Sequence, residues 1–297
     1  MLKTIANDIK IAHSIFALPF AVLAAFMAAG WPAGRSIDWR IFGVQLTLIC
    51  VAMVCARTVA MLANRYLDRE LDATNPRTAN RALPSGALSP KQVLTAMLVC
   101  AIAFIAIAAL FLVLYGNWWP LALSVPVLIW ISAYGLLKRF TWLCHIYLGS
   151  SLALSPIAAA LAIEPHAITM QPSLWWISGM VLCWVAGFDV IYALQDVQAD
   201  RKDGLYSMPS RLGIRTSLWI SRGLHLIAAS CLIVATILDP RMQLFFGMGV
   251  GVVIVLLVYE HATVATWGTK KIALTFFTLN GVISIVLGAL GVMDVLG

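Results

Sequence analysis

Charged residues are scarce in this chain. Only 11% of its 297 residues are Asp, Glu, Lys or Arg, whereas soluble domains carry about 25%. Hydrophobic residues make up 62% of the sequence, and its mean hydropathy is +0.92. This balance excludes an ordinary soluble domain and indicates an integral membrane protein.

Other features that would point elsewhere are also missing. The six cysteines lie mostly in apolar runs with no pair at metal-ligand spacing, so we interpret them as small apolar helix residues. No Pro- or Ser-rich linker or low-complexity tract divides the sequence, so we expect one integral-membrane domain over residues 1–297. No clear small-residue cleavage site follows the first apolar run, so no cleavable secretory signal is expected. The net charge of +7 comes without a basic aromatic patch, which argues against nucleic-acid binding.

Long apolar runs are abundant. A helix needs about 20 apolar residues to cross roughly 30 Å of hydrocarbon, and nine runs meet that requirement. We therefore predict an all-α fold of nine transmembrane helices around a central cavity. The predicted spans are 11–30, 41–64, 92–115, 118–137, 142–163, 173–195, 215–237, 241–260 and 272–293.

The Lys and Arg residues fall unevenly on the two sides of these spans. The amino terminus and the loops after spans 2, 4, 6 and 8 share one side and hold most of the cations. The opposite side holds only Arg35, Arg40 and Arg241. Because cytoplasmic loops carry the excess of positive charge, we expect the cation-rich side in the cytoplasm of a bacterial-type inner membrane.

The second span ends in a row of polar side chains spaced four residues apart: Asn64, Asp68 and Asp72. On a helix this spacing drifts by only about 40° per step, so the three side chains share one face. Thr74 and Asn75 precede Pro76, which is expected to end the helix. Cations lie around the row: Arg57 in the span, then Arg77 and Arg81 beyond the proline.

The sixth span ends in a second acidic row. Asp189, Asp196 and Asp200 lie at offsets of seven and four residues, which places them within about 40° of one another on a helix. Acidic residues at the end of a single membrane span usually mark only the interface with water. A second row on the same side indicates a functional site.

Two acidic rows beside a cytoplasmic cavity suit Mg²⁺, which prefers oxygen ligands and shares itself with phosphate groups. Arg and Lys supply direct phosphate contacts. A magnesium-bridged diphosphate on a carbon that forms a stable cation would then leave readily. A membrane favours a long lipid chain on that carbon. This is the chemistry of prenyl transfer from an allylic diphosphate.

Several motifs resemble the UbiA superfamily of membrane prenyltransferases. NRYLDRELD is similar to its first acidic signature and DVIYALQDVQAD to its second. The loops NPRTANRALPSG, YGLLKRFTWLCHIYLG and GLYSMPSRLG also resemble family loops, and the likeness runs from about residue 8 to 215. The resemblance implies an all-helical fold around a cavity, Mg²⁺ dependence and a polyprenyl diphosphate donor whose tail leaves towards lipid.

The resemblance also implies roles for matching residues. Asn64, Asp68 and Asp72 would form one metal-binding set, and Asp196 and Asp200 the other, with the four aspartates catalytic. Asn64 would also bind substrate, and the remaining candidates would bind the diphosphate or the acceptor: Arg57, Arg77, Arg81, Lys138, Arg139, Asp189 and Tyr192. The sequence leaves open whether Asp189, or His145 after the fourth span, acts directly.

We interpret the chain as a polyprenyltransferase of respiratory quinone biosynthesis with a 4-hydroxybenzoate-like acceptor. A naphthoate precursor of menaquinone is the close alternative, and haem a more distant one. Tyr206 stands where many 4-hydroxybenzoate enzymes show lysine, which bears on the acceptor. Prenyl chain length, oligomeric state and protein partners do not follow from the sequence.

A transporter that uses buried acids as ion sites is the alternative from another class. Transporters place such acids near the bilayer midplane in broken helices, whereas both rows here lie at span ends beside arginine-rich loops. A third alternative is an inactive scaffold of a quinone-synthesis complex, which would fold without turnover.

Overall fold

The computed structural model describes residues 2–9, 16–32, 34–272 and 275–297. Within these ranges the chain is helical, without strands. The helices of the first half are α1 (Leu2–Asp8), α2 (Leu18–Ala29), α3 (Trp39–Leu67), α4 (Arg69–Thr74), α5 (Pro90–Tyr115), α6 (Trp119–Leu137) and α7 (Cys144–Ile163). Those of the second half are α8 (Ala167–Met170), α9 (Pro172–Tyr192), η2 (Ala193–Gln195), α10 (Val197–Lys202), α11 (Met208–Leu212), α12 (Ile214–Leu238), α13 (Leu244–Trp267), η3 (Gly268–Lys271), the π-helical η4 (Thr275–Leu279) and α15 (Asn280–Leu296).

Eight of the described helices are long and apolar enough to cross a membrane, which makes the protein a multi-pass membrane protein. They correspond to the second to ninth predicted spans, although residues 273–274 of the last prediction lie outside the described residues. The first prediction, 11–30, corresponds to the shorter apolar helix α2. Its 12 residues reach only about 18 Å, and residues 11–15 lie outside the described ranges.

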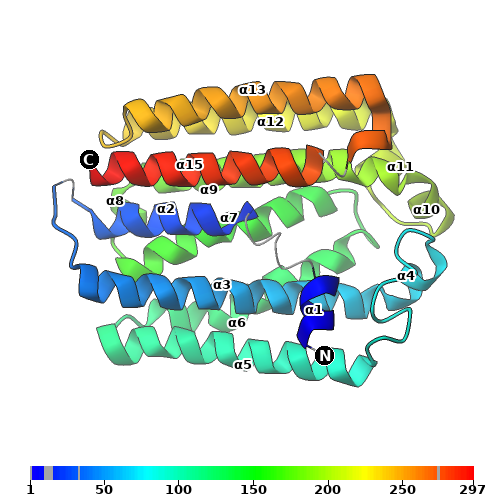
Figure 1. Cartoon of the computed structure of the whole chain (residues 1–297), viewed down its shortest axis with the longest axis horizontal. Helices are drawn as coiled ribbons and strands as arrows, with labels where there is room; N and C mark the ends of the chain where they lie inside the picture. Colours follow the sequence, from blue (N-terminus) through cyan, green and yellow to red (C-terminus); the bar gives the residue numbers. More distant parts are fainter. Residues whose placement is uncertain (1, 10–15, 33, 273–274) are drawn as a thin grey trace.

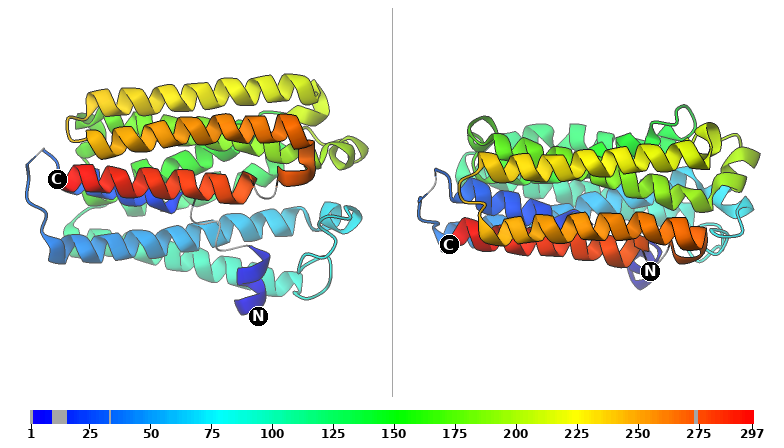
Figure 2. Two further views of the ribbon diagram at one scale, coloured as in Figure 1. Left: turned by 45° about the horizontal axis from the view of Figure 1, so that its top comes forward. Right: turned by 90° about the horizontal axis from the view of Figure 1, so that it is seen from above.

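The long helices lie side by side along the long axis of the molecule (Figure 1). One group consists of α3, α5 and α6, which pack on one another, and α7 joins it to α2 and α9. Helix α9 packs on both α7 and α12, and it is the most buried of the candidate spans. Figure 2 shows α12, α13 and α15 together on the other side of the bundle. Helix α9 is therefore the central element.

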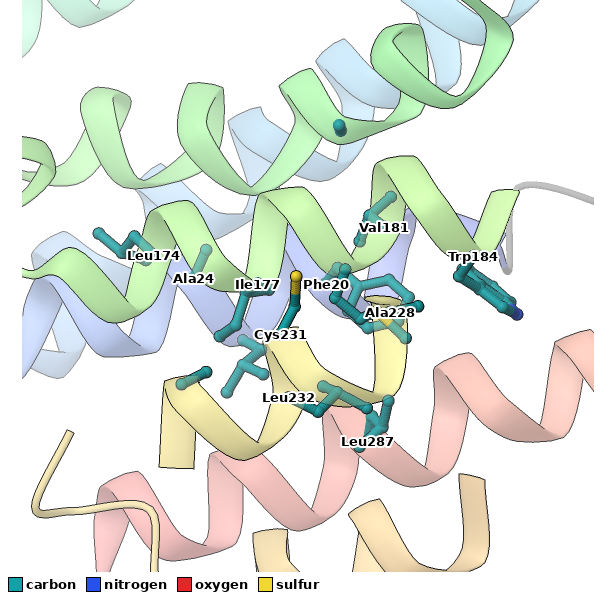
Figure 3. Close-up of a cluster of buried hydrophobic side chains, with 14 of the residues drawn as sticks. Phe20, Ala24, Leu174, Ile177, Val181, Trp184, Ala228, Cys231, Leu232 and Leu287 are labelled. Atoms are coloured by element: carbon teal, nitrogen blue, oxygen red, sulfur yellow. The ribbon is translucent and has the colours of Figure 1, made fainter. Parts of the chain in front are cut away.

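The apolar core lies around α9 (Figure 3). Leu174, Ile177, Val181 and Trp184 point from α9 into a cluster completed by side chains of α2, α12 and α15. Lipid is as apolar as these side chains, so helix association in a membrane depends on close packing and on hydrogen bonds between helices. The indole Nε1 of Trp184 supplies such a bond, donating to Asn280 Oδ1 of α15 at 2.8 Å.

Helices α7 and α9 pack closely where they cross. A Cβ on Gly149 would overlap the backbone carbonyl of Leu182, which cannot move independently of its helix. We expect Gly149→Ala to destabilise the protein by about 1–3 kcal/mol through overpacking and to lower the thermal unfolding midpoint in detergent. The matched control is Gly43→Ala on α3, where a Cβ meets nothing within 4 Å. That change is expected to stabilise by about 0.4–1 kcal/mol, and equal midpoints would contradict the packing argument.

The three short helices α4, α10 and α11 lie at the same end of the bundle (Figure 1). Helix α4 follows α3 directly, and α10 follows α9 through η2. Both acidic segments of the sequence therefore emerge at one end of the molecule, although more than a hundred residues separate them.

Candidate active site

The first acidic row bends at its middle residue. Helix α3 ends at Leu67, and Asp68 adopts φ −95° and ψ 5° before α4 begins. This backbone region is sparsely populated and recurs at active-site residues. The amide of Asp72 still donates to the Asp68 carbonyl at 2.7 Å. The expected uninterrupted helix to Thr74 is therefore wrong, yet the two carboxylates remain one helical turn apart.

The second acidic row repeats this geometry. Helix α9 ends at Tyr192, and Asp196 adopts φ −103° and ψ 3° before α10 begins. The amide of Asp200 donates to the Asp196 carbonyl at 2.8 Å. A single helix through Asp189, Asp196 and Asp200 is thus a wrong expectation as well. In both motifs a long helix is followed by an aspartate that immediately precedes a short helix, and a second aspartate lies within that short helix.

Both rows line one cavity of about 860 Å³. Its walls include all predicted site residues but one: Arg57, Asn64, Asp68, Asp72, Arg77, Arg81, Lys138, Asp189, Tyr192, Asp196 and Asp200. The exception, Arg139, lies behind the wall with its NH2 atom 3.2 Å from Asp68 Oδ1. The predicted set is therefore brought together in a single site.

The carboxylates of the first row are buried and paired with cations. Asp68 is 2% exposed and Asp72 6% exposed. Lys138 Nζ lies 2.8 Å from Asp68 Oδ2, and Arg81 NH1 lies 2.7 and 2.8 Å from the two oxygens of Asp72. Buried charges persist only when they are paired and hydrogen-bonded. The lysine and arginines predicted near the row are thus the ion-pair partners of its buried carboxylates.

Arg77 connects the two rows. From the loop after α4 it donates to Asp196 through Nε at 2.8 Å and NH2 at 2.6 Å, and to the Tyr192 hydroxyl at 3.2 Å. Such a bidentate pair fixes geometry as well as charge. Although burial opposes the guanidinium charge, Asp196 outweighs it and raises the pKa of Arg77. The loop of the first motif is thereby tied to the second motif.

Asp200 differs from the other acids because a hydroxyl is its direct partner. Ser207, the N-cap of α11, donates to Asp200 Oδ2. Burial raises the pKa of Asp200, and the hydrogen bond from Ser207 works against that rise. Ser207 lines the cavity but was not predicted as a site residue. Its position before Met208 and Pro209 is an N-cap signal, but nothing in the sequence ties it to Asp200.

One buried donor atom at the site lacks a protein partner. Arg57 Nε has no hydrogen-bond partner, and no carboxylate lies within ion-pair distance of Arg57 among the described residues. Arg65, farther along α3, is 7% exposed and does have partners, including Asn64 Oδ1 at 3.1 Å. Arg57 thus supplies a half-buried positive charge with unused donor capacity.

A second, mostly apolar cavity of about 290 Å³ adjoins the first. It lies among α3, α5, α6 and α7, with walls that include Ile49, Phe104, Phe111 and Ile131. The two cavities share the side chains of Arg57, Met61, Tyr134, Leu148 and Leu152. A ligand with a charged head and an apolar tail matches this arrangement.

The donor set fits a hard divalent cation. Four carboxylates and the Asn64 amide offer only oxygen ligands of the kind Mg²⁺ takes, usually through few protein groups plus water and phosphate. No three of the described acidic, histidine or cysteine side chains converge closely enough to hold a metal by themselves. That is expected of a cation that is shared with a phosphate ligand.

Known proteins are similar to this chain. The sequence pattern of the UbiA prenyltransferase family matches residues 17–282. A 4-hydroxybenzoate octaprenyltransferase of Shewanella halifaxensis is 30% identical over 235 residues, 79% of this chain and 77% of that protein. A protein of the same name from Shewanella piezotolerans is 29% identical over 221 residues, 74% and 72% of the two chains.

Solved structures share the fold. The apo structure of a UbiA homologue from Aeropyrum pernix matches with a TM-score of 0.81 and 28% identity, covering 96% of this chain and 98% of that one. A UbiA homologue from Archaeoglobus fulgidus, bound to GPP and Mg²⁺, matches with a TM-score of 0.69. That second match, at 18% identity over 99% of this chain and 100% of the other, supports the fold alone.

Proposed function

The chain belongs to the UbiA prenyltransferase family, and from this premise we propose that it transfers a polyprenyl chain from an allylic diphosphate to an aromatic acceptor with Mg²⁺. The resemblance and the fold class predicted from the sequence are confirmed by the family match and the structural match. One observation carries the proposal: both acidic rows and their basic partners line one cavity that adjoins an apolar chamber.

We assign the metal-binding role to Asn64, Asp68, Asp72, Asp196 and Asp200. When bound, Mg²⁺ would neutralise the diphosphate and make it a better leaving group. The aspartates hold the anion in place only through the metal, because carboxylates and phosphates repel each other. Asp68, Asp72 and Asp196 each form an ion pair with Lys or Arg.

The basic residues have two partners in this scheme. Lys138, Arg81 and Arg77 each form an ion pair with a carboxylate of the site. When the carboxylates bind the metal, the same cations are placed to contact the phosphate oxygens and the departing pyrophosphate. Binding of Mg²⁺ and the diphosphate would therefore replace existing ion pairs between side chains. The charged side chains would not have to be brought together out of water.

The apolar chamber is the proposed position of the first part of the prenyl tail. Phe104, Phe111 and Ile131 on its wall provide apolar contact, and burying each CH₂ is worth about 0.8 kcal/mol. The tail would continue between helices towards lipid. This orientation keeps the diphosphate at the polar end of the bundle and the chain within the membrane.

For the acceptor we propose a small aromatic carboxylate, with 4-hydroxybenzoate first and a naphthoate precursor of menaquinone as the alternative, in respiratory quinone biosynthesis. The relatives named 4-hydroxybenzoate octaprenyltransferases support the first. The unpartnered Arg57 in the cavity supports a carboxylate of either kind and disfavours a haem vinyl group as the target. By its loop charges the site would face the cytoplasm across a bacterial-type inner membrane.

The test is transfer of a labelled polyprenyl group by the full chain in lipid nanodiscs. The donor diphosphate and Mg²⁺ are combined with 4-hydroxybenzoate, 1,4-dihydroxy-2-naphthoate or haem, and labelled product and pyrophosphate are measured. Stoichiometric product and pyrophosphate with one of the carboxylates is expected, and chelation of Mg²⁺ should abolish both. Ion uptake without pyrophosphate release would instead support the transporter, and folded protein without turnover would support the scaffold.

A pH prediction follows from Asp200. Protons compete with a cation for a carboxylate, so activity should fall on the acid side as Asp200 becomes protonated. Ser207→Ala removes the hydrogen bond that lowers the pKa of Asp200, so the acid limb of the kcat/KM profile should move to higher pH. Ser210→Ala is the control, because it also breaks the α11 capping box but does not touch Asp200. Equal shifts in both variants would contradict the assignment.

A further inference from the structure

A histidine and an aspartate from different helices meet on the wall of the first cavity. His145, at the start of α7, places Nδ1 2.7 Å from Asp189 Oδ2 on α9. The His145 side chain is 5% exposed, whereas that of Asp189 is 22% exposed, and both line the cavity. The carboxylate therefore presents its accessible surface to the cavity with the imidazole behind it.

The other ring nitrogen is held by the backbone. The backbone amide of Met208 donates to His145 Nε2 at 3.3 Å, which orients the ring with Nδ1 towards Asp189. His145 thereby fixes the position of the Asp189 carboxylate.

Asp189 differs from three of the four acids assigned to the metal. Asp68, Asp72 and Asp196 are paired with Lys or Arg, and the fourth, Asp200, accepts a hydrogen bond from Ser207. No Lys or Arg forms an ion pair with Asp189 within the described part of the chain. A carboxylate held by Lys or Arg is a poor proton acceptor, so Asp189 is the available proton acceptor beside the aromatic rings.

A group of aromatic rings lines the same cavity as Asp189. Phe188 and Tyr192 flank it on α9, and Phe276 contacts both, with ring centroids 5.2 Å and 4.3 Å away. Phe16 completes the group, 5.8 Å from Phe188. All four rings line the cavity. Offset and edge-to-face contacts favour a flat aromatic ligand here, and ring faces attract a developing cation.

We propose that this aromatic wall binds the acceptor ring and that Asp189 accepts the proton which the ring loses. The inference rests on the proposed prenyl transfer. The bond between the allylic carbon and the diphosphate oxygen breaks, and a ring carbon gives an electron pair to the allylic carbon. The ring C–H bond then breaks, its electrons restore aromaticity, and its proton goes to Asp189. Asp189 is a catalytic residue, and His145 is a positioning residue.

The experiment compares Asp189→Asn with the unmodified protein, using acceptor that carries deuterium at the prenylated ring carbon. Loss of a general base costs about 100-fold or more in kcat, with the KM of the diphosphate unchanged. Because proton removal then limits the rate, deuterium should slow the variant and not the unmodified protein. An unchanged kcat, or a loss without an isotope effect, would overturn the role of Asp189.

His145 is tested by two substitutions. His145→Leu leaves Asp189 without its donor and should lower kcat by up to about 100-fold through misplacement of the carboxylate. His145→Asn keeps an N–H near Nδ1 and should restore most of the rate, and His166→Asn in an exposed loop is the control. Equal loss in both His145 variants would overturn the positioning role. Failure of the proposed function is distinguishable, since the unmodified protein would then prenylate no aromatic acceptor.

Discussion

Replacing Asp68 or Asp196 by asparagine is expected to lower the rate of prenyl transfer by about 100- to 1,000-fold, the usual cost of removing one group that stabilises charge in a transition state. Asparagine keeps the shape of each side chain but not the charge that holds the metal. The rate should be measured with saturating donor and acceptor over a range of Mg²⁺. A raised requirement for Mg²⁺ is expected together with the lower rate.

The matched control lies next to the first row. Glu70 is on the same short helix as Asp72, but its side chain is 84% exposed, and its one ion pair among the described residues is with Arg69, at 3.1 Å. Glu70→Gln should leave the rate unchanged, because an exposed ion pair contributes little. Size-exclusion profiles should show that all variants fold. Full activity of Asp68→Asn, or equal losses in the Asp68 and Glu70 variants, would refute the assigned role.

The acidic motifs could be predicted from the sequence because the spacing of their aspartates keeps them close together, even though the expected unbroken helices are wrong. Four-residue spacing implies neighbouring carboxylates on an unbroken helix. The structure interrupts the helix at Asp68 and at Asp196, yet an amide four residues on still bonds to each carbonyl. The local hydrogen bond preserves the turn across the interruption. The position of the acids was therefore predictable, although the helix boundaries were not.

Contacts between segments that are distant in the sequence could not be predicted from it. Arg77 and Asp196 are 119 residues apart, and either could have met several oppositely charged partners. The pairing of His145 with Asp189 likewise depends on how α7 crosses α9 at Gly149. Hydropathy located the long spans, since length and apolar composition suffice for them. For the first span the structure describes the shorter apolar helix α2, and residues 11–15 of that prediction lie outside the described residues.

Arg57 has the second large expected effect. Its position, about 15 Å along α3 from the end of that helix, puts a half-buried cation where the two cavities meet. If the acceptor carboxylate pairs with it, Arg57→Gln removes one member of a buried charge pair, which costs about 2–5 kcal/mol. The loss should appear as a roughly 30- to 5,000-fold lower kcat/KM for the acceptor, with the KM of the donor diphosphate little changed.

A comparison of acceptors makes this result specific. The unmodified protein should prefer 4-hydroxybenzoate to phenol, which lacks the carboxylate, because a buried site built to bind a polar group discriminates against ligands without it. Arg57→Gln should lose that preference. The control is Arg222→Gln, another arginine within a span, which lies 4.6 Å over the Trp219 ring instead of in the cavity. If the variant instead raised the KM of the donor, Arg57 would bind the diphosphate, and the argument for a carboxylate acceptor would lose its structural support.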